Sequence, residues 1–76
     1  IVRAHAVMQP MADYETRHGK PSNDAPRVQE SETLSHLIQL SIKVDLPIVV
    51  QEKGIDVGVV TRRDILQVIV EGAETS

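Results

Sequence analysis

The chain has no cysteine, tryptophan or phenylalanine, and Tyr14 is its one aromatic residue. Without cysteine there is neither a disulfide framework nor a thiolate metal site. With a single aromatic ring, a surface that stacks nucleic-acid bases on aromatic side chains is excluded. The formal net charge of −3 also lacks the basic excess on which binding to phosphate backbones depends. We therefore expect no nucleic-acid partner, and a core built from valine, isoleucine and leucine.

The sequence also lacks the segments that mark membrane proteins and enzymes. No run approaches the roughly 20 apolar residues of a membrane span, and no signal sequence is present. We expect a cytoplasmic protein and, because the chain begins at Ile1 without methionine, a piece of a longer one. There is no glycine-rich phosphate loop, and the three histidines lack the spacing of a metal site. No serine has a positioned base, so we expect no catalytic residue, no metal and no enzymatic activity.

Composition divides the chain into four parts. Residues 1–11 form an apolar-leaning N-terminal segment that Pro10 stops, and its periodicity fits a short helix as well as an extended arm. Residues 12–26 are almost entirely polar and contain Gly19, so we predict a flexible inserted loop. Tyr14 is the exception there, since the one aromatic side chain is free to fold back over apolar surface. Residues 27–72 are regularly patterned and form the predicted core, and residues 73–76 are a tail.

The core follows the order β-α-β-β-α, which predicts an α+β fold with a small sheet and helices on one face. Apolar residues at helical spacing identify the first helix, and β-branched runs identify the strands. The predicted elements are a strand at 27–29, a helix capped by Ser31 with apolar Leu34, Leu37, Ile38 and Ile42, a strand at 46–50, a hairpin loop at 51–56, a return strand at 57–60, and a helix over 65–70 that Gly72 ends.

The junction between the last strand and the last helix is the most informative part of the sequence. Thr61 followed by Asp64 fits a capping box, in which each residue satisfies a backbone N–H at the helix start. Arg62 and Arg63 then occupy the first turn, where the helix dipole favours negative charge. Two interpretations stay open: a cap alone, or a cap combined with a site that faces a phosphate.

Both predicted helices carry more apolar surface than a small sheet needs. The apolar residues of the segment 65–70 span an arc of about 200°, whereas a helix that covers only its own sheet needs little more than 100°. In the first helix, Leu40 lies well off the stripe of its neighbours. Complete burial within so short a chain is the plainer explanation, but the chain offers little to bury these faces. We expect association through the helices.

The motifs together resemble the cystathionine-β-synthase-type domain, or CBS domain. Similarity covers residues 1–11 and 27–72, and the matching pieces are Val7-Met8-x-Pro10, Val28-x-Glu30-Ser31-Glu32-Thr33-Leu34, Leu46-Pro47-Ile48-Val49-Val50 and Gly58-Val59-Val60-Thr61-x-x-Asp64-Ile65-Leu66. The resemblance implies a β-α-β-β-α unit that works in pairs, with adenosine-ligand clefts between copies and a regulatory role in a larger protein. The N-terminal segment and tail are similar to the C-terminal region of ATPase subunits of glycine-betaine/proline-type ABC importers, at the inner face of the membrane. The inserted loop at 12–26 departs from the family.

Two functional hypotheses follow. In the first, the chain is a regulatory module without an obligatory cofactor that senses AMP, ADP or ATP in a cleft formed with a paired copy, as a homodimer or beside a neighbouring domain. Its site residues are Thr61 and Asp64 for ribose, Arg62 and Arg63 for phosphate, and Leu46, Pro47 and Val28 as walls for the base. In the second, the chain binds no ligand and is a dimerisation or docking module that responds to ionic strength, with Thr61 and Asp64 acting only as caps.

Overall fold

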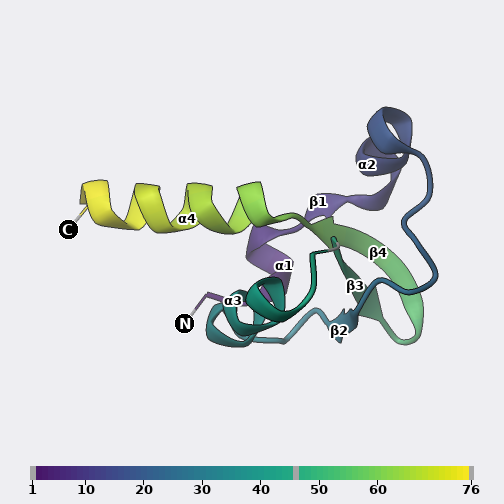
Figure 1. Ribbon diagram of the computed structural model, residues 1–76, viewed down its shortest axis with the longest axis horizontal. Coiled ribbons are helices and arrows are strands. Elements are labelled where there is room, and N and C mark those ends of the chain that lie inside the picture. Colours follow the sequence, from purple (N-terminus) through teal and green to yellow (C-terminus); the bar gives the residue numbers. More distant parts are fainter. Residues whose placement is uncertain (1, 46, 76) are drawn as a thin grey trace.

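The computed structural model describes the backbone of residues 2–45 and 47–75, with side chains up to Glu71 (Figure 1). None of the helices in this part of the chain has the length and apolar character to cross a bilayer. The elements are α1 (Ala4–Val7), β1 (Gln9–Pro10), α2 (Met11–His18), β2 (Arg27–Gln29), α3 (Leu34–Lys43), β3 (Ile48–Glu52), β4 (Ile55–Val60) and α4 (Arg62–Thr75).

The four strands form one mixed sheet in the order β1-β4-β3-β2. Strands β2 and β3 are parallel and joined by α3, whereas the β3–β4 and β1–β4 pairs are antiparallel. The β3–β4 hairpin turns on Lys53 and Gly54, both with positive φ (52° and 81°), as two-residue hairpin turns require. The predicted β-α-β-β-α order is therefore confirmed, with a tighter turn than the loop predicted at 51–56.

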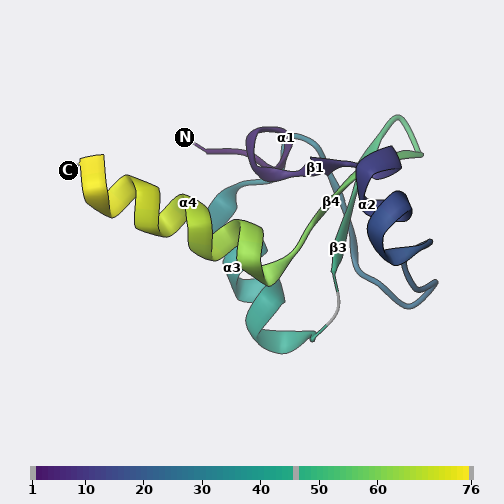
Figure 2. The same ribbon diagram turned by 90° about the horizontal axis from the view of Figure 1, so that it is seen from above.

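The faces of the sheet alternate along each strand, as the two-residue period of a β-strand requires. Ile48, Val50 and Val60 join the main core with α1, α3 and α4, whose buried members include Leu37 and Ile65. On β3 and β4, Val49 and Val59 pair with each other, are fully buried, and lie outside that core cluster. Helices α3 and α4 thus share one face of the sheet, while α2 lies on the other (Figure 2).

The prediction of a loop across residues 12–26 is wrong in its first half, where residues 11–18 form α2. Tyr14 is buried and anchors the helix, and its ring lies 5.0 Å from that of His18. Pro10 is the N-cap residue, one position before the first helical position, where proline is most common. Acidic Asp13 in the first turn and basic residues in the last turn also suit the helix dipole. Residues 19–26 are irregular.

Two predicted helix boundaries also differ. The N-cap of α3 is Thr33 and not Ser31, because the Thr33 hydroxyl accepts from the backbone N–H of His36 (3.4 Å). Helix α4 continues past Gly72 to Thr75. A glycine inside a helix costs about 1 kcal/mol relative to alanine, which weakens the helix without ending it.

Gly58 allows β1 to lie against β4. A Cβ atom at this position would come within 2.5 Å of Met8 Sδ and 2.8 Å of the backbone oxygen of Gln9. Only glycine therefore permits the pairing of Pro10 with Gly58 and of Gln9 with Val59. This pairing brings the side chain of Gln9 to the beginning of α4.

Candidate functional site

A cleft opens where the end of β4 meets the beginning of β3. The hairpin register pairs Ile48 with Val60, so the segment before β3 lies beside the segment after β4. The cleft has a volume of about 170 Å³. Its lining combines apolar side chains with two hydroxyls, one carboxylate and one guanidinium group, and consists of Ser41, Val44, Asp45, Pro47, Ile48, Val60, Thr61 and Arg62.

Thr61 and Asp64 form the predicted capping box. The Asp64 backbone N–H donates to Thr61 Oγ1 (3.2 Å), and Asp64 Oδ2 accepts from the backbone N–H of Thr61 (2.9 Å) and from its hydroxyl (2.9 Å). The same Oδ2 also accepts from Gln9 Nε2 of β1 (3.1 Å). Within the described residues, Asp64 Oδ1 accepts no hydrogen bond. The half-buried Asp64 therefore connects α4 to β1 through one oxygen.

Arg62 spans the opening of the cleft. Its Nη2 donates to the backbone oxygen of Ser41 in α3 (2.8 Å) and lies 3.3 Å from Asp45 Oδ1. The Arg62 side chain is 58% exposed and that of Asp45 is 95% exposed, so water screens this ion pair. An incoming anion can therefore compete with Asp45 for the guanidinium group at little cost.

The structure brings together three of the seven predicted site residues, since Thr61, Arg62 and Pro47 all line the cleft. Leu46 lies outside the described residues. The other three do not line this cleft: Asp64 is directed to Gln9, Arg63 lies on another face of α4 with Leu66, Gln67, Val70 and Glu71, and Val28 is buried in the main core.

Sequence reasoning missed the contribution of α3 and of the segment that follows it. Ser41, Val44 and Asp45 come within reach of Thr61 only because α3 returns the chain to the beginning of β3. The order β-α-β-β itself predicts that the segment after α3 lies near Thr61. In a hairpin, the residues that precede the first strand lie beside those that follow the second.

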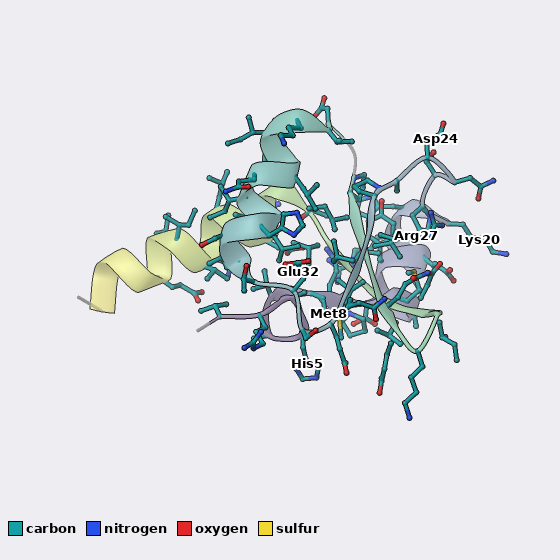
Figure 3. The ribbon with its side chains drawn as sticks, turned by 90° about the horizontal axis from the view of Figure 1, so that it is seen from below. His5, Met8, Lys20, Asp24, Arg27 and Glu32 are labelled. Carbon is teal, nitrogen blue, oxygen red and sulfur yellow. The ribbon has the colours of Figure 1, made fainter. Side chains whose placement is uncertain are left out.

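A second polar group lies at the opposite end of α3. Glu32 Oε2 is 2.8 Å from His36 Nδ1, and Glu32 Oε1 accepts from the backbone N–H of Thr33 (3.1 Å). These hydrogen bonds, that from His36 first, hold the pKa of Glu32 below its ordinary value. Figure 3 shows Glu32 at the start of α3, on the side of the helix that leads to α1. The group caps a helix and is separate from the cleft.

Comparison with known proteins identifies the family. The family model of the CBS domain matches residues 13–71, from the first turn of α2 to Glu71 in α4. CBS domains are generally regulatory, typically non-catalytic modules that commonly bind adenine nucleotides and pair with one another. No curated protein and no solved structure matched the chain. Since the match covers well over half of the sequence, the chain belongs to the CBS domain family.

Proposed function

We propose that this CBS domain is a regulatory module that binds an adenine nucleotide or nucleoside in the cleft between β3 and α4. The observation that carries the proposal is the composition of the cleft. Apolar Pro47, Ile48 and Val60 face a hydroxyl and a guanidinium group at the first turn of a helix. An apolar pocket with a few convergent polar groups is the usual form of a small-molecule site. The helix N-terminus adds a preference for negative charge.

The proposal assigns a role to each group. The base lies between the apolar walls, to which Pro47, Ile48 and Val60 contribute. The ribose hydroxyls donate to Asp64 Oδ1, after a small rearrangement that directs this oxygen into the cleft, and contact the Thr61 hydroxyl. Phosphate takes the place of Asp45 on Arg62, in a charge-assisted hydrogen bond. Val28 stabilises the sheet from within the core, and Arg63 contributes only long-range attraction.

Two arginines in one helical turn provide a matched test. Calorimetry should show that AMP, ADP or ATP binds the 76-residue chain, and that Arg62→Gln weakens binding about tenfold through the lost charge-assisted bond. Arg63→Gln removes the same charge from the neighbouring position, which does not line the cleft, and should change the affinity less than about twofold. Equal losses in the two variants would contradict the site. The absence of heat with every adenine ligand would contradict the function.

A ligand-free module is the second candidate, because the polar groups of the cleft already have partners. Thr61 and Asp64 satisfy each other, and Arg62 pairs with Asp45. In this case Asp64→Ala lowers the melting temperature and changes no binding isotherm, while association of the chain varies with salt concentration. A thermal-shift screen against adenine nucleotides over a salt series separates the two candidates.

For the host, we propose an ATPase subunit of a glycine-betaine/proline-type ABC importer, which would hold the domain at the cytoplasmic face of the membrane. The support is the similarity of residues 1–11 and of the tail to the C-terminal region of such subunits. The test is the reading frame that encodes the chain. A P-loop ATPase domain upstream of Ile1 supports this host, and its absence contradicts it.

A further inference from the structure

The side-chain amide of Gln9, on β1 beside the candidate site, is only partly satisfied. Its Nε2 donates to Asp64 Oδ2 (3.1 Å). Its Oε1 is buried and accepts no hydrogen bond from any residue that the structure describes. Turning the amide over would place Oε1 against the Asp64 carboxylate, acceptor against acceptor, so the bond to Asp64 fixes the orientation. An unpaired buried acceptor destabilises a fold, so the contact with Asp64 is what this amide contributes.

The bond from Gln9 is the longest of the three that Asp64 Oδ2 accepts. The other two come from the backbone N–H and the hydroxyl of Thr61, both at 2.9 Å, and belong to the capping box of α4. Gln9 lies on a different element, since β1 pairs with β4 through two residues and lies beside the junction of β4 and α4 in Figure 1. The carboxylate can therefore leave Gln9 while the cap of α4 stays intact.

The bond to Gln9 competes with the role that the proposed function gives to Asp64. Asp64 does not line the cleft, so its Oδ1 reaches the ribose hydroxyls only after the carboxylate turns toward them. This turn separates Oδ2 from Gln9 Nε2, and the amide then loses the one partner that the structure gives it. Because the ribose must displace an internal donor, the affinity of the cleft is lower than it would be without Gln9.

We propose that Gln9 is a positioning residue that holds Asp64 out of the cleft and thereby sets the affinity for the ribose of the ligand. Its bond to Asp64 is here called the latch. The proposal rests on the proposed function, because it takes Asp64 as the group that binds ribose. A bound ribose turns Asp64, opens the latch and removes one link between β1 and α4. Since coupling is reciprocal, any movement of the N-terminal segment that separates Gln9 from Asp64 raises the affinity of the cleft.

Gln9→Met tests the latch by calorimetry with AMP on the 76-residue chain. Methionine keeps the length of the side chain and removes both the latch and the unpaired oxygen, so the affinity for AMP should rise about fivefold, the worth of one hydrogen bond. Dideoxy-AMP lacks the ribose hydroxyls and does not draw Asp64 into the cleft, so its affinity should stay within about twofold. Gln29→Met is the matched control, because Gln29 is exposed on β2 at the opposite edge of the sheet, and should leave both affinities unchanged. ATP and dideoxy-ATP replace this pair of ligands if the chain binds only the triphosphate.

Nuclear magnetic resonance of the original chain gives a second readout, which does not depend on how any variant folds. The side-chain N–H signals of Gln9 should move when AMP binds and stay in place when dideoxy-AMP binds, because only the ribose hydroxyls draw Asp64 away. Three results overturn the latch alone: an AMP affinity that Gln9→Met leaves unchanged or lowers, an equal gain for dideoxy-AMP, or Gln9 signals that AMP does not move. If no adenine nucleotide binds either the original chain or Gln9→Met, the proposed function and the latch fail together.

Discussion

Gly58→Ala tests the close approach of β1 to β4. The added Cβ atom would lie 2.5 Å from Met8 Sδ, 2.9 Å from Met8 Cγ and 2.8 Å from the backbone oxygen of Gln9. The methionine side chain can rotate away, but the Gln9 oxygen belongs to the backbone of β1. The strand must therefore shift, which weakens its pairing with β4 and the bond from Gln9 Nε2 to Asp64 Oδ2.

The expected cost follows from these contacts. Overpacking in a well-packed site costs about 1–3 kcal/mol, and alanine recovers about 0.5–1 kcal/mol relative to glycine in a strand. We expect a net loss of about 1–2 kcal/mol in the free energy of unfolding, or about 4–16 °C in melting temperature for a chain of this size. Urea and thermal unfolding followed by circular dichroism measure both quantities. In a Met8→Ala background, Gly58→Ala should still lower the free energy of unfolding, although by less than in the original chain. The reason is that the backbone oxygen of Gln9 still blocks the added Cβ atom. A Gly58→Ala chain as stable as the original would refute the reasoning.

Three further predictions concern the helices. Thr61→Ala removes the N-cap of α4 and should lower the free energy of unfolding in urea by about 1 kcal/mol, with Thr61→Ser as the control that keeps the hydroxyl. The pKa of Glu32 is lowered in the folded state, so its contribution to stability is present above the unfolded pKa and is lost as pH falls through the folded pKa. In urea unfolding from pH 7 to pH 3, Glu32→Gln should therefore lose less free energy of unfolding than the original chain. Equal losses in the two chains would contradict the role of the bond between Glu32 and His36. Tyr14→Ala removes the buried anchor of α2 and should speed limited tryptic cleavage after Arg17 in the last turn of that helix, whereas unchanged cleavage would show that α2 does not depend on this ring.

Local patterns in the sequence were sufficient for the core of the fold. The β-branched runs, the capping box at Thr61 and the helical spacing of Leu34, Leu37 and Ile38 are each read within a few residues of one another. Helix α2 could not be predicted in this way, because a single apolar side chain, Tyr14, holds it on the sheet. Its helical character is carried by the charges at its two ends, which are a weaker signal than an apolar stripe.

The candidate site required information that no local pattern holds. Pro47 and Thr61 come together through the register of the hairpin, and Asp45 joins them through the length of α3. Val28 has the apolar character of a pocket wall, but the parallel pairing of β2 with β3 places it opposite Val50 in the core. Residue type therefore indicated the chemistry of the site, whereas tertiary pairing decided which residues share the cleft.

The capping box explains why the two hypotheses are difficult to separate at Thr61 and Asp64. Both residues stabilise the beginning of α4 whether or not a ligand binds, so substitution of either one changes stability under both hypotheses. Arg62 differs, because its ion pair is exposed and contributes little to stability. A loss of adenine affinity in Arg62→Gln without a loss of folding free energy therefore reports on the ligand alone. Arg63→Gln, one residue further along the same turn, provides the baseline for the removal of one positive charge.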